Sequence, residues 1–383
     1  MSVTAAKGFR AAGIAAGIKE SGNPDLALVV NDGPRLAAAG VFTSNRVKAA
    51  PVLWSEQVVK GGQVSAVVLN SGGANACTGP QGFQDTHATA EKVAGTLGLN
   101  AGEVAVASTG LIGVTLPMDK LLPGVGTAAA ALSAHGGEKA AIAIKTTDSV
   151  HKTAVAEGAG WTVGGMAKGA GMLAPGLATM LVVLTTDADV AAPDLDRALR
   201  EATRLTFDRV DSDGCMSTND TVLLLASGAA AVTPEYAEFA DAVRQVCDDL
   251  ARQLIGDAEG ASKDIRIEVI GAADEDDAVE VGRSIARNNL LKCAIHGEDP
   301  NWGRVLSAIG TTSAAFEPDR LNVAINDVWV CKNGSVGEDR DLVDMRYREV
   351  RITADLAAGS ASAVIWANDL TADYVHENSA YSS

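Results

Sequence analysis

The residue whose type and position most directly suggest chemistry is Thr179, near the middle of the 383-residue chain. It follows a glycine-rich stretch, residues 164–176, and directly precedes the apolar run 180–184, whose length and β-branched content predict a buried strand. A threonine hydroxyl is a poor nucleophile at neutral pH unless a base lies beside it. One solution is an N-terminal threonine, because its own α-amine titrates at about 7.7–8.0 and can serve as the base.

That solution requires the chain to be cut between Ala178 and Thr179. In the uncut chain the hydroxyl would attack the Ala178 carbonyl and form an ester, which water would then hydrolyse. Small neighbours and glycines would help the backbone to reach the strained geometry of this attack. The alternative is an ordinary junction between a loop and a strand, and the pattern alone leaves both interpretations open.

Other catalytic motifs find little support. The nucleotide-binding pattern G-x-x-x-x-G-K-S/T is absent, because Lys168 precedes its glycine, and the glycines lead into a strand instead of a helix. No serine-hydrolase elbow, G-x-S-x-G, is present with its partners in order. The five histidines show no paired metal-binding spacing, so no metal site is predicted. His296 is the best metal-ligand candidate, and we expect it to be a hydrogen-bonded structural residue.

A second feature lies at the end of the short apolar run 104–107, where Ser108, Thr109 and Gly110 follow a predicted strand. Backbone N–H groups at such a strand end can stabilise developing negative charge. An ordinary turn is the alternative interpretation.

Composition narrows the class of partner. A formal net charge of −17 argues against a nucleic-acid partner, since binding to phosphate backbones needs clustered Lys and Arg. Small molecules or other protein subunits are the expected partners. The five cysteines are scattered and form no C-x-x-C pair, and neither a signal sequence nor a long apolar run is apparent. We therefore expect a cytoplasmic protein without a membrane span.

Apolar patterns predict the elements that position these residues. We expect strands at 64–69, 104–107, 141–144, 180–184 and 263–270, helices at 193–205 and 234–255, and a hairpin formed by 26–30 and 36–41 around the turn 31–34. No linker interrupts the chain near Thr179. The two halves of the chain are therefore expected to form one interleaved α/β body.

Several of these stretches, in this order, resemble the ornithine acetyltransferase (glutamate N-acetyltransferase) family. The most specific is the run KGAGMLAPGLATML at 168–181, which resembles the self-cleavage motif of that family. The others are FTSNR at 42–46, NACTG at 75–79, STNDT at 217–221, HGEDPNWGR at 296–304 and ENSAY at 377–381. The resemblance extends over essentially the whole chain.

The resemblance implies transfer of acetyl from N2-acetylornithine to glutamate by a ping-pong cycle in arginine biosynthesis. Autocleavage would give an alpha chain, 1–178, and a beta chain, 179–383, which together form an α/β sandwich and assemble as a heterotetramer of two alpha and two beta chains. No resident cofactor is implied, and acetyl-CoA is an additional donor in some members. The site residues carried over by the resemblance are the nucleophile Thr179, the oxyanion pair Thr109 and Gly110, and the substrate contacts Thr146 (or its neighbour Thr147), Lys168, Thr179, Glu259, Asn378 and Ser383.

Two alternatives remain at this stage. One is a self-processed N-terminal-threonine amidohydrolase or aminopeptidase, in which water replaces glutamate as the acceptor. The other is a non-catalytic protein that binds small molecules and keeps its chain uncut.

Overall fold

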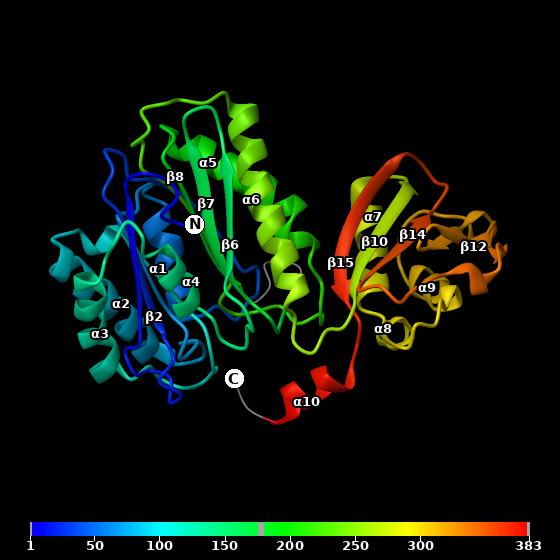
Figure 1. Cartoon of the computed structure of the whole chain (residues 1–383), viewed down its shortest axis with the longest axis horizontal. Coiled ribbons are helices and arrows are strands. Elements are labelled where there is room, and N and C mark those ends of the chain that lie inside the picture. The colour runs from blue at the N-terminus through cyan, green and yellow to red at the C-terminus, as the bar shows by residue number, and fades with distance from the viewer. Residues whose placement is uncertain (1, 175–179, 381–383) are drawn as a thin grey trace. The chain divides into compact units, whose positions relative to one another are not determined.

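A computed structural model of the chain describes residues 2–174 and 180–380, and these residues divide into two compact units. The first unit contains the described residues of Met1–Asp208 and Cys215–Asp257, and the second contains Arg209–Gly214 and the described residues of Ala258–Ser382. Figure 1 shows the chain coloured from its N-terminus to its C-terminus. Ala178, Thr179 and Ser383, named by the sequence as cleavage or site residues, lie outside the described residues.

Two β-sheets form the centre of the first unit. The four-stranded sheet has the order β1-β2-β4-β5, and the five-stranded sheet has the order β3-β9-β8-β7-β6. The bounds of the first sheet are β1 (Phe9–Ile14), β2 (Leu26–Asn31), β4 (Ala66–Asn70) and β5 (Val104–Ser108). Those of the second are β3 (Ala37–Phe42), β6 (Lys152–Glu157), β7 (Thr162–Lys168), β8 (Leu181–Thr186) and β9 (Thr221–Ala226).

The two sheets pack against each other because their strands are apolar on both faces. Val67 on β4 and Val183 on β8 belong to one buried cluster between the sheets. The adjacent residue Val68 points to the opposite face and packs with Val93 of α2 and Val125 of α3. Such two-sided burial is typical of strands inside a layered α/β structure.

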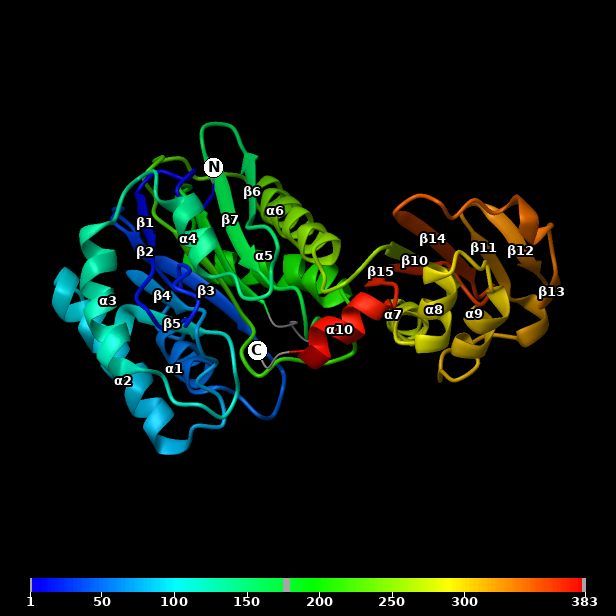
Figure 2. The same cartoon turned by 60° about the horizontal axis from the view of Figure 1, so that its bottom comes forward.

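Helices cover the outer faces of both sheets. Figure 2 shows α2 and α3 beside the four-stranded sheet, and Figure 1 shows α6 alongside β6 and β7. The helices of this unit are α1 (Ala50–Val59), α2 (Gly79–Leu97), α3 (Met118–Ala130), α4 (Gly137–Ala143), α5 (Ala192–Leu205) and α6 (Tyr236–Gly256). The predicted layered α/β sandwich is confirmed.

The strands on either side of the glycine-rich stretch belong to one sheet. β7 pairs with β8 in an antiparallel register that runs from Lys168↔Leu181 to Val163↔Thr186, and β8 pairs in parallel with β9. The described chain before and after the predicted cut therefore contributes neighbouring strands to a single sheet. The division into an alpha chain and a beta chain itself stays a prediction.

Two of the predicted elements were wrong. β2 and β3 do not form a hairpin, since β2 pairs with β1 and β4, whereas β3 pairs with β9 in the other sheet. Asn31 redirects the chain between the sheets, because its Nδ2 donates to the carbonyls of Arg35 and Ala226. The predicted strand at 141–144 overlaps the end of helix α4. A short apolar run does not separate strand from helix by its periodicity.

The second unit has its own apolar core, so the expected single body applies only to the first unit. Its six strands have the order β13-β12-β11-β14-β10-β15, with β10 parallel to β14 and antiparallel to β15. The strands are β10 (Asp264–Ala272), β11 (Asn322–Ile325), β12 (Val328–Lys332), β13 (Ser335–Val336), β14 (Glu349–Asp355) and β15 (Ala361–Asn368). The helices are α7 (Glu275–Ala286), α8 (Asn289–His296), α9 (Trp302–Ile309) and α10 (Ala372–Ala380).

Over the described residues, every helix is too short or too polar to cross a membrane.

Candidate active site

The end of β5 presents Thr109 and Gly110 in a fixed backbone conformation. Thr109 N donates to Asn70 O at 2.9 Å, and Thr109 O accepts from Gly73 N at 3.0 Å. Gly110 has a φ of +129°, and a Cβ there would lie 2.7 Å from Gly73 N, so only glycine fits. Within the part of the chain that the structure describes, Gly110 N–H makes no hydrogen bond.

This geometry assigns different groups to the two residues. The Thr109 N–H is already used by Asn70, so Thr109 can offer only its hydroxyl to a developing oxyanion. Gly110 can offer its backbone N–H. The donors available at this strand end are therefore one backbone amide and one side-chain hydroxyl, and their role toward an oxyanion stays a prediction.

Lys168 joins this strand end to the start of the glycine-rich stretch. It is the last residue of β7 and only 2% of its surface is exposed. Its Nζ donates to Thr109 Oγ1 at 3.3 Å. An ammonium group has no acceptor, so the Thr109 hydroxyl keeps its own hydrogen for another acceptor. Two residues that the resemblance named, 59 positions apart in sequence, are thus brought into contact.

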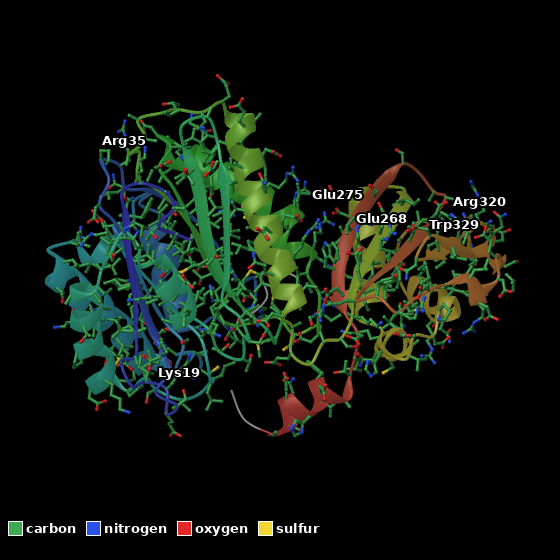
Figure 3. The ribbon with its side chains drawn as sticks, viewed as in Figure 1. Lys19, Arg35, Glu268, Glu275, Arg320 and Trp329 are labelled. Carbon is green, nitrogen blue, oxygen red and sulfur yellow. The ribbon has the colours of Figure 1, made fainter. Side chains whose placement is uncertain are left out.

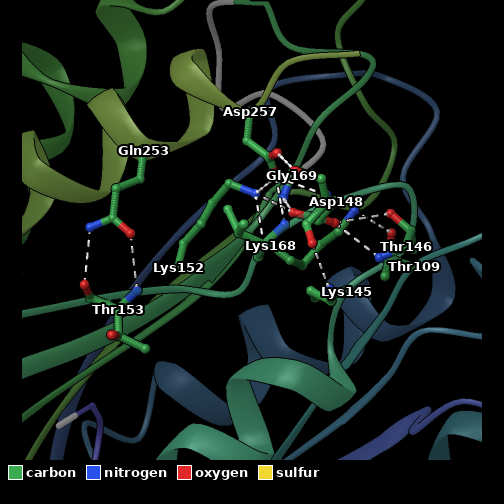
Figure 4. Close-up of polar contacts among 12 residues, drawn as sticks. Thr109, Lys145, Thr146, Asp148, Lys152, Thr153, Lys168, Gly169, Gln253 and Asp257 are labelled. Carbon is green, nitrogen blue, oxygen red and sulfur yellow. Dashed lines mark hydrogen bonds and ion pairs between the residues drawn. The ribbon is translucent and has the colours of Figure 1, made fainter. Parts of the chain in front are cut away.

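Asp148 is the centre of a buried polar cluster that positions both Lys168 and Thr146. Its Oδ1 accepts from Gly169 N at 2.6 Å and from Lys152 Nζ at 2.7 Å, and its Oδ2 accepts from Thr146 N at 2.9 Å (Figure 4). Burial alone would raise the pKa of the Asp148 carboxyl, but the charges of Lys168 and Lys152 outweigh it and hold that pKa well below its usual range. Asp148 is therefore a carboxylate at neutral pH.

Lys152 shares its charge between two carboxylates. Its side chain is fully buried, and its Nζ also donates to Asp257 Oδ2 at 2.5 Å. Gln253, one turn earlier on α6, exchanges two hydrogen bonds with the backbone of Thr153 on β6 (Figure 4). These contacts fix the end of α6 against the strand that carries Lys152.

Lys19, labelled in Figure 3, supports the loop that carries Thr146. Its Nζ donates to Lys145 O at 2.6 Å and to Pro24 O at 3.2 Å. Burial lowers the pKa of Lys19, and the nearby charge of Lys168 lowers it further. Several lysines therefore share this region with Asp148, which makes it suited to a carboxylate-bearing ligand.

The segment before β9 connects the end of β5, before Thr109 and Gly110, to the start of β8. Asn219 Nδ2 donates to Ala74 O at 2.6 Å and to Ser108 O at 2.8 Å. The next residue, Asp220, accepts from Met180 N at 3.0 Å through Oδ1. The sequence identified this segment only through the motif STNDT at 217–221, because nothing in the local pattern indicates these distant partners.

The second unit brings two further predicted residues together. Asn378 on α10 donates through Nδ2 to Glu259 Oε2 at 2.9 Å and to Tyr374 O at 3.0 Å. In the same unit, His296 Nδ1 lies 3.0 Å from Asp369 Oδ2. His296 is therefore hydrogen-bonded, as predicted for a structural histidine. No group of three or more His, Cys, Asp or Glu side chains suited to a metal ion occurs among the residues described.

Of the predicted residues in the first unit, Thr109, Gly110, Thr146 and Lys168 converge on the Asp148 cluster and the end of β5. Thr146, not Thr147, bonds to Asp148 through both its N–H and its hydroxyl. The assignment of Thr146 as a substrate contact stays a prediction.

Comparison with known proteins places the chain in a family. The ArgJ family model matches residues 10–383. The chain belongs to the ArgJ family. An ArgJ family relative from Streptomyces avermitilis, named arginine biosynthesis bifunctional protein ArgJ, is 86% identical over the full length of both chains. A relative of the same name from Thermobifida fusca is 64% identical, again over the full length of both.

A solved ArgJ relative is the ornithine acetyltransferase from Mycobacterium tuberculosis, crystallised with ornithine. It is 61% identical to this chain, and the match covers 47% of this chain and 96% of the solved chain, with a TM-score of 0.45. The family model and the relatives from Streptomyces avermitilis and Thermobifida fusca confirm the family resemblance predicted from the sequence.

Proposed function

We propose that this chain is the ornithine acetyltransferase of arginine biosynthesis, which moves acetyl from N2-acetylornithine to glutamate. Membership of the ArgJ family supports the activity. The observation that carries it in the structure is the contact of Lys168 with Thr109, beside the Gly110 N–H that no described residue uses as a donor. A buried cation and two hydrogen-bond donors are the groups that an acyl transfer between amino acids needs.

Thr179, freed by cleavage after Ala178, acts as the nucleophile in this proposal. Its α-amine takes the hydroxyl proton while the oxygen attacks the acetyl carbonyl of acetylornithine. The Thr109 hydroxyl and Gly110 N–H stabilise the oxyanion. The C–N bond then breaks, the proton passes to the leaving amine, and ornithine departs from the acetyl ester on Thr179.

The second half of the cycle reverses these steps with glutamate. The neutral amine of glutamate attacks the acetyl ester, and the Thr109 hydroxyl and Gly110 N–H again stabilise the oxyanion. The Thr179 oxygen recovers its proton as N-acetylglutamate leaves. Both substrates carry an α-carboxylate, and we assign it to the Lys168 ammonium, with Thr146 beside it.

The remaining contacts are proposed from the family resemblance. Glu259 would hold the side-chain amino group of ornithine, since a carboxylate pairs with an ammonium group. Asn378 already bonds to Glu259 and would orient that carboxylate. Ser383 is the third residue proposed to contact the substrate.

Assembly, location and donor choice belong to the same proposal. The two cleavage products would assemble as a heterotetramer of two alpha and two beta chains in the cytoplasm. No resident cofactor is needed, because Thr179 carries the acetyl group. We propose acetyl-CoA as a second donor, in keeping with the name bifunctional protein that the relatives carry.

A product assay tests the proposal. The purified protein is incubated with acetylornithine, with and without glutamate, and acetylglutamate and free acetate are both measured. Acetylglutamate that forms only with glutamate supports the transferase. Acetate that forms at the same rate without glutamate would instead indicate the amidohydrolase alternative. A parallel reaction with acetyl-CoA and glutamate decides whether acetyl-CoA is a donor.

A further inference from the structure

Asp220 is a fully buried carboxyl group that contacts Met180, the residue that follows the predicted nucleophile in the sequence. It lies directly before β9 and has an exposed fraction of 0%. Its Oδ1 accepts a hydrogen bond from Met180 N at 3.0 Å, and Met180 O accepts one from Thr221 N at 3.1 Å. Met180 N–H belongs to the peptide group that joins Thr179 to β8. Asp220 is therefore hydrogen-bonded to the peptide that carries Thr179.

The second oxygen of Asp220 is buried and unpaired. Among the described residues, Oδ2 has no hydrogen-bond partner. The Thr43 hydroxyl, which lies nearby, donates to Ser217 O instead. Lys168 acts on this carboxyl as a nearby charge, and no ion pair between the two is found among the described residues.

A buried carboxylate without an ion pair is costly, so such a group normally keeps its proton. Burial raises the pKa of Asp220 well above its usual value, and the hydrogen bond from Met180 N and the charge of Lys168 offset this only in part. The hydroxyls of Thr43 and Ser217 lower that pKa by smaller amounts. An uncharged Asp220 can hold the Met180 amide with Oδ1 and carry its proton on Oδ2.

We propose that Asp220 is a positioning residue, which anchors the nucleophile Thr179 through the Met180 amide. The adjacent Asn219 bonds to Ser108 O, so one short segment fixes both the oxyanion end of β5 and the start of β8. The lack of charge has a function of its own. An ionised carboxylate near the Thr179 α-amine would stabilise the ammonium form, which cannot serve as a base.

This inference rests on the proposed function, in which Thr179 performs both self-cleavage and acetyl transfer. In the cleavage step Thr179 Oγ bonds to the Ala178 carbonyl carbon, the Ala178–Thr179 C–N bond breaks, and the nitrogen gains the proton that the hydroxyl loses. Water then hydrolyses the ester, which gives the Ala178 carboxyl group and restores the hydroxyl. Asp220 gives up no proton in these steps and acts only by holding Thr179 in place.

Two substitutions separate this role from others. In Asp220→Asn the side chain stays uncharged and its amide oxygen can accept from Met180 N, so we expect cleavage and kcat within about threefold of the wild type. In Asp220→Ala the anchor is lost, and a displacement of the nucleophile by about 1 Å lowers rates on the order of 10²-fold. We expect slower cleavage and a lower kcat for acetyl transfer, with KM for acetylornithine nearly unchanged.

Ser227→Ala is the matched control. Ser227 is also fully buried and lies directly after the other end of β9, where its Oγ donates to Lys7 O at 2.6 Å. This substitution should lower Tm about as much as Asp220→Ala and leave cleavage and kcat unchanged. Cleavage is followed by intact mass over time, and kcat/KM is measured from pH 5 to pH 9.

Each outcome decides a different claim. A wild-type chain that stays uncut would overturn the proposed function and this inference with it. If the wild type is cut, Asp220→Ala with unchanged cleavage and kcat would overturn only the inference. The inference would also be overturned if Asp220→Asn were as slow as Asp220→Ala. The same holds if the acidic limb of the kcat/KM profile of Asp220→Asn lay at lower pH than in the wild type, since either result would indicate a charged Asp220. An Asp220→Ala protein that does not fold leaves the Asp220→Asn comparison and its pH profile to decide.

Discussion

Replacement of Asp148 by Asn should weaken both the fold and substrate binding, because this carboxylate joins the buried Lys152 to the predicted substrate contacts. The Asp148 and Lys152 side chains are both 0% exposed, and their ion pair measures 2.7 Å. Removing one partner of such a pair typically costs about 3–5 kcal/mol. Lys152 keeps Asp257 as a second partner, so we expect about 3 kcal/mol, the lower end of that range.

Binding should weaken for a related reason. Gly169 N and Thr146 N both donate to the Asp148 carboxylate, and an amide replaces one of the two acceptors by a donor. If Lys168 and Thr146 are less well oriented, we expect the binding free energy of acetylornithine to weaken by about 1.4 kcal/mol. This corresponds to a tenfold weaker affinity, so KM for acetylornithine should rise by about tenfold. The kcat should change less, because the backbone of Thr109 is held by Asn70 and Gly73 and not by Asp148.

The assay has a stability part and a kinetic part. Urea unfolding is measured in a Thr179→Ala background, so that a single uncut chain unfolds, and KM is measured in the cleaved protein. Asp257→Asn is the matched control, since it also removes a partner of Lys152 but leaves Thr146 and Gly169 bonded to Asp148. It should lower stability with KM within about threefold. Asp148→Asn within 1 kcal/mol of wild-type stability and with an unchanged KM would refute this reasoning.

Three further predictions follow from the same contacts. Thr109→Ala should lower kcat by about 10²–10³-fold with a small change in KM, because one oxyanion donor is lost. Thr109→Ser keeps a hydroxyl and should retain most of the rate. Acetyl-transfer assays measure both variants, and equal rates for Thr109→Ala and the wild type would remove Thr109 from this role. Gly110→Ala should abolish transfer, because its Cβ would lie 2.7 Å from Gly73 N, and activity above a tenth of wild type would contradict this steric argument. Burial raises the pKa of Asp211 to about 6, so the folded state binds the proton of this carboxyl more tightly than the unfolded state. The free energy of unfolding should therefore fall by up to about 3 kcal/mol between pH 4 and pH 6 and then level off. Urea unfolding of Asp211→Asn should show no such pH dependence, and a variant that keeps it would exclude Asp211 as its source.

Local pattern was enough for the strands that deliver the site. The apolar runs that end at Ser108 and begin after Thr179 have the length and composition of buried strands, and β5 and β8 are both found there. The motif resemblance also named Lys168 and Thr109, which the structure places in contact. Their contact depends on the pairing of whole sheets, so the spacing of 59 residues alone could not predict it.

The structural features that were predicted wrongly or not at all depend on contacts between residues far apart in the sequence. Nothing in the turn 31–34 indicates that β2 and β3 enter different sheets, because that choice is made by pairing with β1, β4 and β9. The Asp148–Lys152–Asp257 cluster joins residues more than 100 positions apart. The charges of Lys168 and Lys152 lower the pKa of Asp148 despite its burial, whereas burial raises the pKa of Asp220. A sequence does not show which carboxylates are buried beside lysines.

The most direct test of the whole account is the intact mass of the purified wild-type protein beside its Thr179→Ala variant. We predict that the wild type consists of two fragments, 1–178 and 179–383, and that the variant is one uncut chain without acetyltransferase activity. A wild-type protein that transfers acetyl as a single uncut chain, or a Thr179→Ala variant that still splits after Ala178, would contradict the central claim that Thr179 cuts the chain and then carries the acetyl group.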